Sequence, residues 1–135
     1  MRNRVLRAAR SLAAVVAGYA VIVAGTTLAF EVWLGGIGYY KSSTPVLAVA
    51  SLAAFASGSA GGYVAAWLGG RPHLLHAAGV LLPLIIDTTY VVTSGVSSDP
   101  LWYDLVGALT LMAAAITGGY VRQNVSKKGS ALPAT

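Results

Sequence analysis

The sequence predicts an all-α, polytopic membrane protein that folds as a bundle of four transmembrane helices. Two observations lead to this prediction. Hydrophobic residues make up 56% of the chain and charged residues only 10%, whereas a soluble domain carries about 25% charged residues. The chain therefore could not cover a water-facing surface. The charges are also segregated, which leaves four apolar runs that are each long enough to cross a bilayer.

The first predicted helix spans about residues 11–34 and follows a basic segment, residues 1–10. A basic start before an apolar run is also the pattern of a signal peptide. However, this run is longer than the apolar part of most signal peptides, and it ends in the bulky Phe30 and Trp33 instead of a small-residue cleavage site. We therefore favour a retained transmembrane helix.

The second predicted helix, residues 45–68, is the expected spine of the bundle. Thr44 and Pro45 favour a helix start, with a hydroxyl cap followed by proline at the first helical position. Small residues fill the middle of this helix and let neighbouring helices approach backbone to backbone. The packing residues we predict here are Gly58, Gly61 and Gly62.

The third predicted helix spans residues 73–93 and contains Pro83 near its middle. Proline lacks the N–H that would bond the carbonyl of Gly79, so we expect Pro83 to act as a hinge that kinks the helix.

The fourth predicted helix spans residues 100–121. It opens with Asp99-Pro100, which we interpret as a helix cap followed by proline. Near its end it carries Gly118 and Gly119, a second small-residue pair for helix packing. Residues 123–135 form a basic, then small and polar, tail that we expect to be flexible.

The basic residues predict the orientation. Eight of the nine Lys and Arg residues fall on the side that holds the N-terminus, the turn at Arg71 and the C-terminal tail, and only Lys41 falls on the other side. The positive-inside rule then places both termini in the cytoplasm. Because topology explains the positive charge, we predict no nucleic-acid partner.

Two short strings recur in the sequence. Residues 42–45 (SSTP) resemble 97–100 (SSDP), and 61–64 (GGYV) recur at 118–121. The pattern indicates two duplicated helical hairpins in parallel orientation, and chance in a Gly- and Ala-rich chain is the alternative. In a duplicated chain Glu31 and Asp87 occupy nearly corresponding positions.

Acidic residues within the spans are the main candidates for chemistry. Charge in hydrocarbon is costly and usually faces the bundle interior, so we predict that Asp87, Glu31 and Asp104 converge on an outward-facing pocket that binds a cation or a proton. Thr88 and Tyr90 would be hydrogen-bond partners in this pocket. The alternative stays open that Glu31 and Asp104 sit at the membrane interface and that a nearby hydroxyl satisfies Asp87.

His73 and His76 lie three residues apart, close to Arg71. Two histidines on one helical turn cannot ligate haem from opposite faces, and no further metal ligand lies nearby in the sequence. We predict that all three residues contact lipid head groups. We predict no metal, no cofactor and no catalytic residues.

The segment SAGGYVAAWL at residues 59–68, followed by Gly70-Arg71-Pro72 and His76-Ala77, resembles a pattern in small bacterial four-helix integral membrane proteins of uncharacterised function. The resemblance covers about a third of the chain. It implies a four-helix layout in the bacterial cytoplasmic (inner) membrane, and it implies no activity.

Two functional hypotheses follow. In the first, the protein is non-enzymatic and has a structural or accessory role, packing with another copy or with a larger membrane complex through its small-residue faces. In the second, it is a small cation- or proton-coupled transporter or channel that uses the acidic pocket. Contact with the lipid bilayer is common to both.

Overall fold

The computed structural model describes residues 2–129. Within this range the structure is helical between short loops, with the elements α1 (Arg2–Thr27), η1 (Leu28–Trp33, a π-helical continuation of α1), α2 (Thr44–Gly69), α3 (His73–Gly79), α4 (Leu81–Ser94) and α5 (Leu101–Gly129). Four helical stretches are long and apolar enough to cross a membrane: Asn3–Trp33, Thr44–Gly69, His73–Ser94 and Leu101–Gly129. The predicted all-α fold with four spanning helices is confirmed, and the chain is a multi-pass membrane protein.

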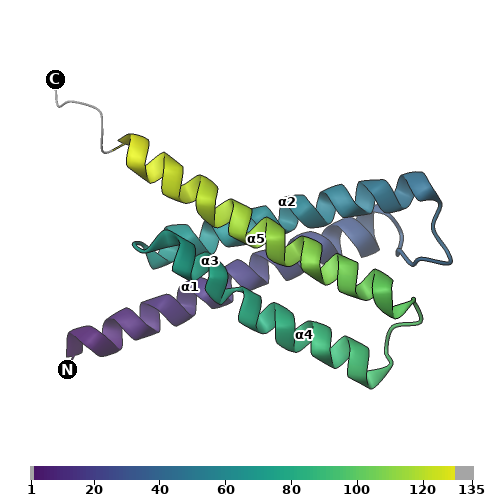
Figure 1. Cartoon of the computed structure of the whole chain (residues 1–135), viewed down its shortest axis with the longest axis horizontal. Coiled ribbons are helices and arrows are strands. Elements are labelled where there is room, and N and C mark those ends of the chain that lie inside the picture. Colours follow the sequence, from purple (N-terminus) through teal and green to yellow (C-terminus); the bar gives the residue numbers. More distant parts are fainter. Residues whose placement is uncertain (1, 130–135) are drawn as a thin grey trace.

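The loops alternate between the two ends of the bundle (Figure 1). One end, which we name the basic end, holds residues 3–10, the turn at 70–72 and the last turns of α5. The other end holds the loops at 34–43 and 95–100, and we name it the acidic end because every Asp and Glu of the sequence lies toward it.

Helix α2 lies at the centre of the bundle, where it packs extensively against α1 on one side and α5 on the other. The contact with α5 is made through backbone, because a Cβ atom added at Gly62 would overlap the carbonyl of Ala115. Likewise, a Cβ atom at Gly118 would overlap the carbonyl of Ser59. At Gly58 an added Cβ would lie only 2.7 Å from the Cβ of Ala114.

The remaining glycines that the sequence singled out also lie in helix contacts. Gly61 faces Gly18 and Ile22 of α1, and Gly119 faces Ala77 of α3. All five glycines are buried. The small-residue faces of α2 and α5 are therefore used inside this chain.

The third span is not one helix over residues 73–93, as expected, but two helices separated at Val80. Since Pro83 has no N–H to donate to the carbonyl of Gly79, the series of α-helical backbone hydrogen bonds is interrupted at this point of the span. The N–H of Val80 instead donates to the carbonyl of Ala77, 3.2 Å away, which tightens the turn. The Val80 side chain is fully buried beside Ile22 and Ala65 in the core.

This interruption separates two kinds of packing. Helix α3 contacts α1, α2 and α5, whereas α4 packs chiefly against α5. In Figure 1, α4 accordingly diverges from α1 and α2 toward the acidic end.

The outer helices extend farther than expected. The basic N-terminal segment is the first part of α1, and α5 continues through residues 123–129, part of the tail that the sequence predicts to be flexible. The rest of that tail lies outside the described residues. No proline or glycine interrupts residues 120–128, so nothing in the sequence ends α5 near Val121. Helix α2 begins at Thr44, with Ser43 as its cap, one residue before the predicted start.

Candidate functional site

A cleft of about 610 Å³ lies at the acidic end, between η1, α2, α4 and α5. All four acidic residues of the sequence line it: Glu31, Asp87, Asp99 and Asp104. No lysine, arginine or histidine is among the lining residues. The structure thus brings the three acids singled out from the sequence to one cleft, together with a fourth, Asp99. The volume falls within the range of small-molecule sites, about 300–1,000 Å³.

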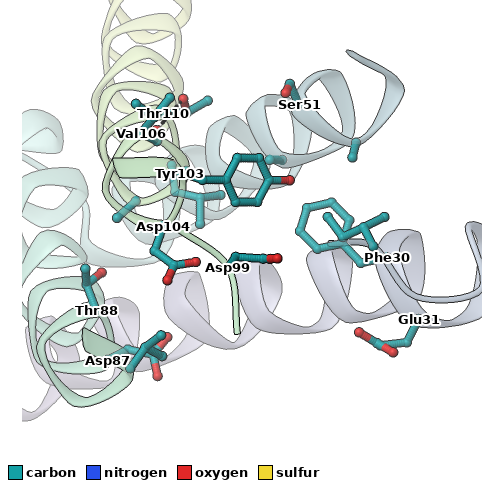
Figure 2. A pocket seen from close by; sticks show the side chains of 17 residues that line it. Phe30, Glu31, Ser51, Asp87, Thr88, Asp99, Tyr103, Asp104, Val106 and Thr110 are labelled. Atoms are coloured by element: carbon teal, nitrogen blue, oxygen red, sulfur yellow. Dashed lines mark hydrogen bonds between the residues drawn. The ribbon is translucent and has the colours of Figure 1, made fainter. Parts of the chain in front are cut away.

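Each carboxylate comes from a different part of the fold (Figure 2). Glu31 lies in η1, where the N–H of Leu34 donates to the carbonyl of Ala29, 3.0 Å away, in a widened turn. Asp87 lies on α4, beyond the interruption at Val80. Asp104 is in the first turn of α5. In Figure 2, Asp99 and Asp104 occupy the middle of the view, with Asp87 and Glu31 on opposite sides.

The carboxylates differ in exposure and in bonding. Glu31 and Asp87 are exposed, and Asp99 and Asp104 are half-buried. Asp99 Oδ1 accepts a hydrogen bond from the N–H of Tyr39, 2.9 Å away. Asp99 therefore ties the two loops of the acidic end together and is not the helix cap that the sequence indicates. The carbonyl of Pro100 accepts the first helical bond of α5, from the N–H of Tyr103 at 2.8 Å.

Hydroxyl groups supplement the carboxylates in the walls. The hydroxyls of Thr88, Ser51 and Thr110 donate to the carbonyls one turn earlier in their own helices, at 2.7, 2.9 and 2.8 Å respectively. Their oxygen lone pairs stay available as acceptors. Tyr103 also lines the cleft, whereas the predicted partner Tyr90 is exposed and is not among the lining residues.

The carboxylates share a cleft without forming a compact cluster. Among the residues that the structure describes, no three Asp, Glu or His side chains are close enough together to hold a metal ion. Apolar residues, among them Phe30, Val91 and Leu111, complete the walls. This arrangement suits protons, or a cation that contacts a few carboxylates and an apolar wall, better than a chelated metal ion.

Aromatic rings gather beside the cleft. The ring of Tyr39 packs edge-to-face on Tyr40 and on Trp102, with centroid separations of 5.1 and 5.0 Å. Tyr103 packs on Tyr39 at 5.6 Å. Such edge-to-face pairs stabilise the contact between the 34–43 loop and α5. The backbone N–H of Tyr39 also donates to Asp99, so this aromatic cluster helps to hold the Asp99 carboxylate in place.

The two histidines lie inside the bundle, with only 8% of His73 and 7% of His76 exposed. His76 Nδ1 donates to the carbonyl of Pro72, 3.0 Å away, because a carbonyl can only accept. His76 Nε2 then accepts from the hydroxyl of Ser11, 3.0 Å away. A Cβ at Gly69 would overlap the imidazole of His76, so this glycine makes room for the ring.

The sequence predicts that His73 and His76 contact lipid head groups. The burial of His76, with both ring nitrogens bonded inside the chain, does not favour such a contact. For His73 the contact stays a prediction. The neighbouring helices enclose both rings. Ser11 and the carbonyl of Pro72 satisfy the two ring nitrogens of His76. His73 is bonded through Nδ1 only, to the carbonyl of Ala66, and its Nε2 has no hydrogen-bond partner among the described residues. Arg71, the third residue of that prediction, is exposed.

Comparison with known protein families, with characterised proteins and with solved structures found no match to this chain. The resemblance to small bacterial four-helix proteins therefore rests on the sequence pattern alone. The structure supports the four-helix layout that this resemblance implies.

Proposed function

We propose that this protein is a small transporter or channel in which a cation or protons bind at the cleft of the acidic end. The observation that carries the proposal is the gathering of all four Asp and Glu side chains around one cleft, which no basic residue of the described part of the chain lines. Carboxylates in membrane-spanning helices are costly and mark ion or proton pathways. The proposed role is non-enzymatic.

The orientation that goes with this proposal has both termini in the cytoplasm of a bacterium and the protein in its inner membrane. The positive-inside bias supports it, since eight of nine Lys and Arg residues belong to the basic end. In this orientation the cleft opens to the outside. Reporter fusions at Ser97 and at the C-terminus test it, with only the C-terminal fusion expected to be cytoplasmic.

Asp87 is the proposed coupling residue. It lies about four residues beyond the middle of the His73–Ser94 span, which is about 6 Å along a helix, and so it is deeper than Glu31 or Asp104. A carboxylate can bind either a proton or a metal or organic cation. Competition between the two at Asp87 is the proposed basis of exchange.

The experiment is a flux assay with the purified protein in liposomes. A pH gradient or an added organic or alkali cation should drive proton movement, and Asp87→Asn should abolish it. Lys41→Gln is the matched control, because it changes the charge at the same end without altering a cleft residue, and it should leave flux unchanged. Absence of flux in the wild type for protons and for every cation tried would refute the transport proposal.

A structural or accessory role is the second candidate, and the exposed face of α4 favours it. Leu82, Ile85 and Ile86 are exposed on a helix that packs chiefly against α5. The small-residue faces that first suggested this role are used within the chain, so a second copy or a membrane-protein partner would instead cover α4. Its test is co-purification of a stoichiometric partner that Ile86→Trp removes and that Leu109→Trp, on exposed α5 surface, retains.

A further inference from the structure

A second cleft, of about 650 Å³, lies at the basic end, between the α2–α3 turn and the last turns of α5. Its polar lining residues are Arg71, His73, Gln123, Ser126 and Lys127. Gln123, Ser126 and Lys127 are spaced three and four residues apart on one helix, so they share one face of α5. The turn and this face together present two cations and an amide to the same space.

The two cations of this cleft have no acidic side chain to pair with. Every Asp and Glu of the sequence lines the cleft at the opposite end of the bundle. Arg71 and Lys127 are both exposed, so an external anion can reach them. An anion here would meet no competing carboxylate side chain.

His73 lies at the inner side of the cleft. Its Nδ1 donates to the carbonyl of Ala66, 2.9 Å away, which fixes the tautomer of the neutral ring. Its Nε2 is buried and has no hydrogen-bond partner among the described residues. A buried polar atom without a partner is uncommon. With the ring proton on Nδ1, Nε2 is an acceptor, which a protonated phosphate oxygen (P–OH) can satisfy.

The depth of the cleft in the bilayer points to the head-group region. Helix α5 has 29 residues, a length of about 44 Å at 1.5 Å per residue, whereas the hydrocarbon core is about 30 Å thick and takes about 20 residues. Counted from Leu101, the hydrocarbon ends near Val121. Gln123 and Lys127 then lie at the level of the lipid phosphates.

We propose that the basic-end cleft binds a phosphate group, carried either by an anionic phospholipid or by a soluble phosphate. The guanidinium of Arg71 matches two phosphate oxygens with its fork of N–H donors, Lys127 adds a point charge, and the amide of Gln123 adds a neutral donor. This site is independent of the acidic-end cleft, and the two proposals can fail separately.

The test uses the full chain in nanodiscs of zwitterionic phosphatidylcholine, with two probes. In one arm, phosphatidic acid is added in increasing fraction and retained lipid is counted by native mass spectrometry. In the other arm, inorganic phosphate is titrated calorimetrically. The variants are Arg71→Gln and Lys127→Gln. Lys128→Gln is the matched control, since it removes the same charge from the adjacent exposed position, outside the cleft.

We expect the affinity for phosphate to fall about fivefold or more for each cleft variant, the effect of one Lys or Arg near an anionic surface, and clearly less for Lys128→Gln. Site-dependent binding of phosphatidic acid alone identifies a lipid ligand, and site-dependent binding of inorganic phosphate identifies a soluble one. If neither probe binds, or if Lys128→Gln weakens binding as much as Lys127→Gln, the proposal is wrong. The variant residues are exposed, so circular dichroism should show unchanged helix content.

Discussion

The two ends of this bundle are built from the same four spans but are packed in opposite ways. At the basic end α2 and α3 contact each other and both contact α1 and α5, and the histidines are enclosed. At the acidic end α4 diverges, and a cleft lined by four carboxylates opens between the helices. Stability and the candidate site are therefore concentrated at different ends of the molecule.

The difference follows from how helices associate in lipid. Water does not drive apolar helices together inside a bilayer, so close packing depends on small residues that let backbones meet. Gly61, Gly62, Gly118 and Gly119 provide this contact in the basic half of α2 and α5. Beyond the interruption at Val80, α4 (Leu81–Ser94) contains no glycine or alanine, and a cleft remains around the carboxylates.

The largest expected effect compares two glycines on α5. Gly118→Ala forces a Cβ into the carbonyl of Ser59, and we expect it to lower the free energy of unfolding by about 3 kcal/mol, as in an overpacked core. Gly107→Ala, where nothing lies within 4 Å of the added Cβ, should be neutral or should stabilise the helix by about 0.5–1 kcal/mol. Unfolding in mixed micelles, followed by tryptophan fluorescence, measures both. Equal effects would show that the two ends are packed alike.

A smaller effect is expected at the enclosed histidine. His76→Ala removes two hydrogen bonds and leaves a cavity beside Gly69, so we expect a loss of about 2 kcal/mol. Ser11→Ala removes one of these bonds and keeps the ring, and it should lower stability by about 1 kcal/mol. The same unfolding assay applies. If His76→Ala were neutral, the ring would not contribute to the tight packing of this end.

The smallest effect is expected at the open end. Asp99→Ala removes the acceptor for the N–H of Tyr39 and should lower stability by only about 0.5–1 kcal/mol, because the bond is exposed to solvent. Asp99→Asn retains an acceptor oxygen at this position and is the control, with a smaller loss. Hydrogen exchange at Tyr39 should speed up in Asp99→Ala and change less in Asp99→Asn. Unchanged exchange in Asp99→Ala would contradict the proposed link between the two loops.

The sequence predicted the spans well because each depends on local composition. The four apolar runs and the small residues Gly58, Gly62 and Gly118 can be identified without knowing which helices lie beside them. The interruption near Pro83 was also predictable, because proline lacks an N–H donor in any context. The position of the interruption at Val80 could not be predicted, because Val80 is held by packing against Ile22 and Ala65.

The site was only partly readable. Asp87, Glu31 and Asp104 were found because charge in an apolar span is conspicuous. Asp99 was interpreted as a helix cap, since Asp before proline is common capping chemistry, and its bond to Tyr39 spans 60 residues. The duplication of the two hairpins remains a prediction.

The sequence by itself therefore determined that this chain spans a membrane four times, because apolar length and charge segregation are properties of each segment alone. Only the tertiary structure decided which residues of the four spans pack together and which line a cleft. In the structure the histidines are enclosed and the small residues of α2 and α5 face inward. Helix α5 continues beyond Val121, so that Gln123, Ser126 and Lys127 line a basic cleft, and the carboxylates lie around one cleft at the other end. The physical reason is that burial and pairing depend on residues far apart in the chain, whose meeting is set by helix crossing and by the interruption at Val80.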